Sequence, residues 1–140
     1  MPTGCYSSPA RGGSVVASFP DVPGALTEGA DEADAMALAE DCLITALGGY
    51  VKLARAIPQP SPPGGKPPVA VPPLAAAKLG LHEGMSHAGL TTTVLAERLG
   101  VPEAAMRRLL DLDHRSHIGE IERALALLGK RLVVEVLEAA

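Results

Sequence analysis

Apolar residues in the second half of the chain recur at the three- and four-residue spacing of helices that bury one face. A first helix ends near Gly89, and a second is capped by Thr91 and ends at Gly100. Pro102 suits the first turn of a third helix, and Ile118–Leu128 has the pattern of a fourth. The apolar positions of the first three helices are Leu74, Leu81, Met85, Val94, Leu95, Leu99, Met106, Leu109 and Leu110.

The end of the chain has a different pattern. KRLVVEVLE, at 130–138, is rich in valine and alternates at its end, which predicts a strand. An isolated strand must find an edge to pair with. We therefore expect this segment to pair between two copies of the chain.

The first half combines short β-rich segments with one long helix. Ser14–Phe19 is β-rich and stops at Pro20, PDVPG supplies turn residues, and Ala25–Glu28 is typical of a following strand. Asp31 can cap a helix whose first turn is acidic. The apolar face of this helix consists of Met36, Ala39, Leu43, Leu47 and Tyr50. A hairpin followed by a helix makes this half α+β.

A proline-rich stretch separates the two halves. Eight of the chain's 13 prolines fall in residues 58–73, PQPSPPGGKPPVAVPP, which excludes an ordinary helix or central strand and predicts an extended linker. VAV, at 69–71, can add an edge strand. We expect residues 1–57, with a strand at 69–72, to form one domain and residues 74–140 a second, helical one.

Composition narrows the classes of function. The formal charge is -4, which excludes a globally basic nucleic-acid coat, but three of the arginines cluster in residues 98–108. Cys5 and Cys42 are the only cysteines, and the first residues lack the pattern of a secretion signal. We expect a cytoplasmic protein with reduced thiols and no membrane span.

Candidate metal and catalytic sites are weak. HEGMSH, at 82–87, separates His82 from His87 by five positions, whereas the zinc motif H-E-x-x-H separates its histidines by four. DLDHRSH, at 111–117, could hold a metal, but a solvated or phosphate-contacting loop fits its arginine and serine better. No serine or cysteine has a clear base partner, and no glycine loop fits a phosphate. We expect no enzyme activity, cofactor or metal.

The stretch from Leu90 to Asp111 contains two short amphipathic helices joined at Leu99-Gly100-Val101. A helix-turn-helix needs such a tight turn and a second helix whose exposed start enters the major groove. Arginine there can bind guanine or phosphate. From the pattern alone, a plain helical hairpin with solvated arginines remains an alternative.

The chain also resembles a known family. Residues 74–129 resemble the Xre/Cro-type helix-turn-helix through GLTTTVLAERLGVPEAAMRRLL and IERALALLGKRL. Residues 12–138 resemble HicB-type antitoxins through further segments in the same order. These segments are GGSVVASFPDVPG, EGADEADAMALAEDCL, IPQPS, AAAKLGLHEGM and LLDLDHRSHIGEIERALALLGKRLVVEV.

This resemblance implies a two-domain antitoxin. A small partial ribonuclease-H-like β-β-β-α-β domain would bind and mask a HicA-like, mRNA-cleaving ribonuclease toxin. A helix-turn-helix domain would bind the palindromic operator of its own operon and repress transcription as a homodimer or higher oligomer. The ribonuclease-H-like fold implies no nuclease activity, because no catalytic metal ligands are recognisable.

The resemblance also implies roles for single residues. Thr91 would cap the first helix of the motif and Thr92 would lie near phosphate, while Glu103, Ala104 and Arg107 would face the bases. The residues expected near the DNA backbone are Arg108, His114, Arg115 and Ser116.

For toxin binding we expect the strand–turn region and the adjoining acidic surface to face a basic toxin. The residues of that region are Phe19, Pro20, Asp21, Pro23 and Gly24. For Phe19 itself, a place in the core is the favoured interpretation.

Two features depart from the family pattern. TGCYSSPARGG, at 3–13, is short, polar and interrupted by Pro9, which predicts a truncated or poorly formed first strand. Glu103 is acidic where amide side chains are common, which predicts a different operator preference.

The weak first strand motivates one alternative, a stand-alone helix-turn-helix regulator with a degraded first domain. Another is a small nuclease-like enzyme that depends on Asp21 or Asp31.

Overall fold

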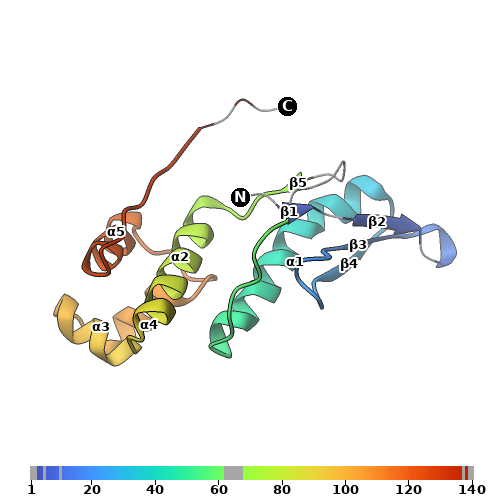
Figure 1. Cartoon of the computed structure of the whole chain (residues 1–140). Coiled ribbons are helices and arrows are strands. Elements are labelled where there is room, and N and C mark those ends of the chain that lie inside the picture. The colour runs from blue at the N-terminus through green and yellow to red at the C-terminus, as the bar shows by residue number, and fades with distance from the viewer. Residues whose placement is uncertain (1–2, 5, 10, 62–67, 137, 139–140) are drawn as a thin grey trace. The chain divides into compact units, whose positions relative to one another are not determined.

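A computed structural model describes residues 3–4, 6–9, 11–61, 68–136 and 138. The chain divides into two compact units, which we call unit 1 (Met1–Pro72) and unit 2 (Pro73–Ala140). Among the described residues, strands occur only in unit 1 and helices occur in both (Figure 1). The chain is therefore α+β, as its sequence predicts.

Unit 1 is built on an antiparallel sheet with the strand order β2-β3-β4. The strands are β2 (Tyr6–Pro9), β3 (Val15–Ser18) and β4 (Leu26–Gly29). The last two confirm the strands expected on either side of the PDVPG turn. Valine at positions 15 and 16 favours the extended backbone of β3, on which Ala17 is fully buried and the other residues are half-buried.

The first strand is better formed than its sequence predicts. Every residue of β2 has a partner on β3, with Tyr6 opposite Ser18 and Pro9 opposite Val15. The prediction of a poorly formed strand is wrong, whereas a strand shorter than in the family stays a prediction. Proline lacks a backbone donor, but β2 is at the edge of the sheet, where that donor is not needed by a neighbour. The short η1 (Arg11–Gly13) then turns the chain back into β3.

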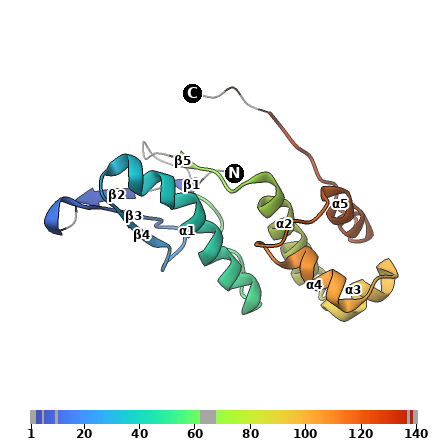
Figure 2. The same cartoon turned by 180° about the vertical axis from the view of Figure 1, so that it is seen from behind.

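One helix covers this sheet. The helix α1 (Glu32–Lys52) crosses one face of it, as Figure 2 shows. Asp31 caps the helix as predicted, because its Oδ1 accepts from the Asp34 backbone N–H at 2.8 Å. The buried positions are Ala35, Ala39, Leu43 and Leu47, so the predicted apolar face is correct at its centre and shifted at its ends.

Close packing of α1 explains a glycine in β4. A Cβ at Gly29 would lie 2.3 Å from the backbone nitrogen of Ala35. No side chain fits at that distance, so the absence of a side chain at position 29 lets the helix start directly against the strand.

The end of the proline-rich stretch pairs with the start of the chain. The strand β5 (Pro68–Val69) pairs antiparallel with β1 (Thr3–Gly4), which confirms an added strand in this stretch, one residue earlier than expected. Val69 is buried. Residues 62–67 of the expected linker lie outside the described residues.

Unit 2 contains the four predicted helices. They are α2 (Pro73–Ala88), α3 (Thr92–Leu99), α4 (Glu103–Leu110) and α5 (Ile118–Leu127). Their core is aliphatic and includes Ala77, Leu81, Met85, Leu95, Ala96, Met106, Leu109, Ile121, Ala124 and Leu125. No helix among the described residues combines the length and the apolar content needed to cross a bilayer.

The predicted strand at 130–138 is wrong for the single chain. Residues 130–136 and 138 form no strand, and the segment leaves the helices as an extended trace (Figure 1). Val133, Val134 and Val136 expose 77%, 63% and 92% of their surface. A strand needs an edge to pair with, and the described part of unit 2 offers only helices. The valine pattern indicates a preference for β structure, but a strand also needs a neighbouring strand to pair with.

Candidate nucleic-acid interface and protein-binding surfaces

The turn between α3 and α4 has the geometry that its sequence predicts. Thr91 caps α3, since its hydroxyl oxygen accepts from the Val94 backbone N–H at 3.2 Å. Gly100 ends α3 in the left-handed conformation, with φ 69° and ψ 32°. Only glycine adopts this conformation without strain. The chain therefore changes direction tightly at Gly100, and α4 follows α3 after a short turn.

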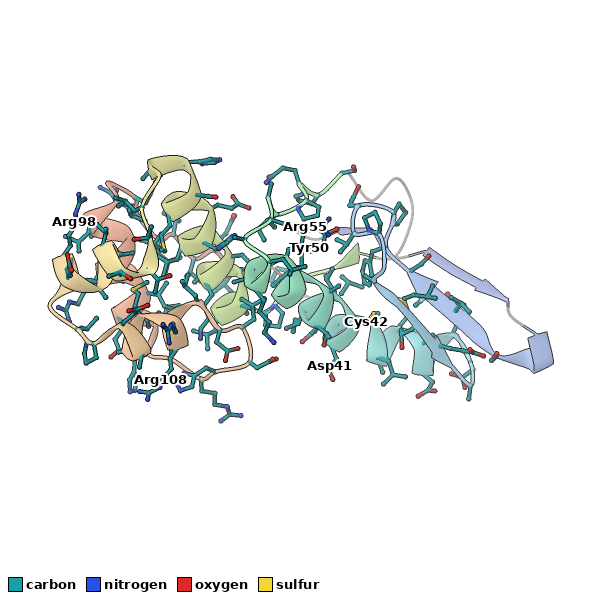
Figure 3. All side chains as sticks on the ribbon, turned by 90° about the horizontal axis from the view of Figure 1, so that it is seen from below. Asp41, Cys42, Tyr50, Arg55, Arg98 and Arg108 are labelled. Carbon is teal, nitrogen blue, oxygen red and sulfur yellow. The ribbon has the colours of Figure 1, made fainter. Side chains whose placement is uncertain are left out.

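The two sides of α4 differ sharply. Met106 and Leu109 are buried in the core, whereas Ala104, Arg107 and Arg108 are exposed. Figure 3 marks Arg108 on α4 and Arg98, also exposed, on α3. The start of α4 thus presents small and charged side chains to solvent.

Two of the expected base-facing residues are bound to each other. Arg107 Nη2 lies 2.7 Å from Glu103 Oε1, an ion pair across one helical turn. The side chains are 70% and 42% exposed, so water screens the pair strongly. Exposed pairs of this kind contribute about 0.3–0.5 kcal/mol. A nucleic acid can therefore replace Glu103 as the partner of Arg107 at small cost.

The most unusual contact in unit 2 was not predicted. Lys78 of α2 is fully buried, and it is the only buried charged side chain among the described residues. Its Nζ donates to the carbonyl oxygens of Arg108, Asp111 and His114 at 2.9, 2.6 and 2.6 Å. It also lies 2.9 Å from Ser116 Oγ. One ammonium group thus ties together the end of α4 and the loop that follows.

Electrostatics explain how a cation is tolerated there. Burial lowers the pKa of Lys78, and the Asp111 carboxylate acts in the opposite direction. The Arg108 carbonyl belongs to the last turn of α4, where the helix dipole is negative and favours a cation. Position 78 lies four residues after Leu74 and three before Leu81, on the apolar face of its helix. A lysine at this spacing is the signal in the sequence that could have predicted the burial of Lys78.

The loop residues expected near a DNA backbone fall into two groups. His114 and Arg115 are exposed, whereas Ser116 is half-buried. Ser116 Oγ accepts from Lys78, donates to the Arg108 carbonyl at 3.4 Å and lies 3.2 Å from His114 Nδ1. The serine is engaged inside the protein, and its role is to shape the loop that carries its neighbours.

The residues from Phe19 to Gly24 divide into exposed ones and ones that are buried or bound within unit 1. Phe19 is 2% exposed, as favoured from the sequence, and the Val22 N–H donates to its carbonyl at 3.1 Å. Both carboxylate oxygens of Asp21 accept from Ser61, from its hydroxyl at 2.6 Å and its backbone N–H at 2.9 Å. Pro20, Pro23 and Gly24 are exposed. Asp21 therefore fastens the start of the proline-rich stretch to this turn.

A groove of about 400 Å³ lies between β4 and α1. Its lining residues are Gly24, Leu26, Thr27, Leu38, Asp41, Cys42, Thr45 and Ala46. Burial raises the pKa of the Cys42 thiol, and a hydrogen bond with the Leu26 backbone acts against that rise. Figure 3 marks Asp41 and Cys42 at successive positions of α1. No pattern in the sequence predicts this groove, because its lining residues come from separate elements.

The other candidate sites do not assemble. His82 is half-buried and His87 exposed. Within the described ranges, no three histidine, cysteine, aspartate or glutamate side chains come together as a metal-binding group. Each buried polar side-chain atom in those ranges has a hydrogen-bond partner.

Comparison with known proteins identifies the family. Residues 7–80 match the family model described as the HicB_like antitoxin of bacterial toxin–antitoxin systems. The chain is 36% identical over 126 residues to Antitoxin HicB of Escherichia coli K12, covering 89% of this chain and 91% of that protein. It is 40% identical over 114 residues to Antitoxin HicB 2 of Photorhabdus laumondii, with 81% of each chain covered. It is 39% identical over 130 residues to Antitoxin HicB of Pseudomonas fluorescens, with 91% of this chain and 88% of that one covered. The chain therefore belongs to the HicB-like antitoxins of bacterial toxin–antitoxin systems.

Proposed function

We propose that the chain is a non-enzymatic antitoxin with two binding activities. Unit 1 binds and masks a HicA-like, mRNA-cleaving toxin. Unit 2 binds the palindromic operator of the toxin–antitoxin operon and represses it. The family supports the antitoxin role, and the two activities are assigned to the two units by the features of each.

The observation that carries the DNA-binding role is the division of α4 into a buried and an exposed side. Met106 and Leu109 hold the helix against the core, while Ala104 and Arg107 remain exposed. The tight turn at Gly100 joins α4 to α3, as a helix-turn-helix requires. We assign Glu103, Ala104 and Arg107 to the bases and Thr91, Thr92, Arg108, His114 and Arg115 to the backbone.

The element order of unit 1 supports the toxin-binding role. The element order β1-β2-β3-β4-α1-β5 contains the β-β-β-α-β succession that the resemblance implies, with β5 paired to β1 outside the three-stranded sheet. The complete pairing of β2 with β3 also supports an intact first domain over the degraded one of a stand-alone regulator. Of the five turn residues assigned to toxin binding, Pro20, Pro23 and Gly24 offer surface, whereas Phe19 and Asp21 shape the turn.

The exposed valines of the C-terminal segment support a dimer. Val133, Val134 and Val136 have no covering element in the single chain. Antiparallel pairing of two such segments would cover them and join two copies of unit 2. Two α4 helices about 34 Å apart would then match half-sites one DNA turn apart.

One set of experiments tests both roles. The full-length chain is titrated onto a palindromic duplex from its own promoter and onto a scrambled duplex, with fluorescence anisotropy as the readout. We expect tighter binding to the palindrome by at least about 1000-fold at physiological salt. Equal affinity for both duplexes would overturn operator binding.

The toxin role is tested by co-expression with the HicA-like reading frame beside the gene. We expect a stable complex on size exclusion and restored growth. Continued growth arrest without a complex would overturn toxin neutralisation. The DNA result remains interpretable in either case.

A further inference from the structure

We propose that the groove between β4 and α1 is the surface on which unit 1 binds its toxin, a small basic RNA-cleaving protein. This inference rests on the toxin-neutralising role proposed above and locates the contact. The surface begins at Gly24, the one residue of the PDVPG turn that lines the groove, and continues along β4 and α1.

Exposed apolar side chains first indicate this surface. In unit 1 the large apolar side chains recorded as exposed are Leu26, Leu38 and Leu53, at 63%, 41% and 68%. Two of them, Leu26 and Leu38, line the same groove from opposite elements. Leu53 lies just past the end of α1, outside the groove. Paired apolar residues around a hollow are typical of a site that receives an anchoring side chain.

Charge then identifies the partner. Residues 12–51 contain seven acidic residues and no lysine or arginine. Asp41 is the one charged residue among the described residues that line the groove. Glu28 follows the lining residue Thr27 in sequence, is exposed, and accepts a hydrogen bond from the Ser14 hydroxyl. Other acidic residues of α1 are Glu32, Asp34 and Glu40. An apolar groove that holds a carboxylate, in a segment without lysine or arginine, favours a basic protein, and a protein that binds RNA needs a basic surface.

The alternative contact, the strand–turn residues at 19–24, is weaker on geometric grounds, because its exposed part is limited to Pro20, Pro23 and Gly24. Phe19 is buried, and both oxygens of Asp21 are held by Ser61. These two residues would have to leave their present partners before they could bind a toxin. The groove residues need no such rearrangement.

The test compares three leucine variants of the full-length chain. Leu26→Arg and Leu38→Arg each place a cation in the groove, and Leu53→Arg is a matched control at an exposed leucine outside it. Calorimetric titration with a catalytically inactive form of the HicA-like toxin measures the affinity. We expect about 30-fold or more weaker binding for both groove variants and less than about threefold for the control.

The possible outcomes are distinct. If wild-type chain binds the toxin and the groove variants bind equally well, the groove is the wrong surface while the proposed function survives. If the wild-type chain binds no toxin, both fail. Thermal unfolding followed by circular dichroism shows whether each variant is folded.

A labelling experiment requires no substitution. Cys42 lines the groove, so bound toxin should slow its alkylation by iodoacetamide at least tenfold, as followed in the Cys42 peptide by mass spectrometry. An unchanged rate in a saturated complex would overturn the proposal. This measurement also decides the case if a groove variant fails to fold.

Discussion

Two cations meet α4 in different ways, since Lys78 of α2 binds the end of the helix and Arg107 extends from its exposed side. Lys78 comes from α2, is fully buried, and is held by three backbone carbonyls and a serine hydroxyl. Arg107 exposes 70% of its side chain and is paired with Glu103. The buried cation is thus surrounded by neutral acceptors, whereas the exposed cation has a full counter-charge.

This difference separates folding from recognition. The acceptors of Lys78 are three backbone carbonyls and a serine hydroxyl, at the end of α4 and in the loop after it, so the lysine cannot leave without breaking all four hydrogen bonds. The partner of Arg107 is an exposed side chain that water already screens. The same helix therefore has a fixed inner end and an outer side whose partner can be exchanged for DNA.

The largest effect is expected when the buried cation is removed. Lys78→Met keeps the length of the side chain but removes the donors of three carbonyls, and each unsatisfied buried acceptor costs about 1–3 kcal/mol. We expect the free energy of unfolding of unit 2 to fall by about 3–5 kcal/mol. Guanidinium unfolding of the full chain, followed by circular dichroism, measures this change.

Lys130→Met is the matched control, because Lys130 is an exposed lysine of the same unit. It should change the free energy of unfolding by less than about 0.5 kcal/mol. Similar losses for the two variants would mean that the network around Lys78 contributes nothing specific.

A smaller effect, on binding instead of folding, is expected for the exposed cation. Arg107→Ala should weaken operator binding by about 1–3 kcal/mol and relax sequence preference. The free energy of unfolding should change by less than about 0.5 kcal/mol, because the ion pair that is lost is exposed. Anisotropy titrations on operator and scrambled DNA measure the affinity and the sequence preference. Equal losses on the two duplexes would contradict a base-reading role and leave a phosphate contact.

Removing the counter-charge sharpens the comparison further. Glu103→Gln deletes the ion pair and should cost about 0.3–0.5 kcal/mol of stability. It should also strengthen binding to scrambled DNA, because Arg107 loses its internal partner and a negative charge near phosphate disappears. Weaker binding to scrambled DNA would instead indicate that Glu103 holds Arg107 in its binding position.

The smallest effect concerns pH. The pKa of Lys78 is lower in the folded chain than its ordinary value of 10.5. Between these two pKa values the unfolded chain binds more protons, so the contribution of Lys78 to the free energy of unfolding rises with pH in that window. The slope just below pH 10.5 should therefore be more positive for the wild type than for Lys78→Met. Equal slopes would show that folding leaves this pKa unchanged.

Elements whose signals are local could be predicted from the sequence. Asp31 and Thr91 each cap a helix through a side chain three residues from its partner, and Gly100 ends α3 by its own backbone freedom. Aliphatic spacing likewise identified the core side of the helices in unit 2. These predictions succeeded because each depends on interactions within one or two helical turns.

Predictions that depended on a distant partner failed or were missed. The sequence of β2 is polar and contains Pro9, but β3 supplies a complete register for it. The opposite holds for Val133, Val134 and Val136. Their sequence favours a strand, but they remain exposed because the described part of unit 2 offers no strand edge to pair with. Strand formation is a property of the pair, and a single segment carries only half of the signal.

The sequence by itself determined the α+β class, the helices of unit 2, the caps and the family to which the chain belongs. Only the tertiary structure decided that Lys78 is buried beneath the loop after α4, that Ser61 holds Asp21, and that Leu26 and Leu38 share one groove. The reason is distance along the chain: Lys78 and Ser116 are 38 residues apart, and Asp21 and Ser61 are 40. Periodicity reports which side of an element is apolar, whereas contacts between distant residues arise only when the elements pack.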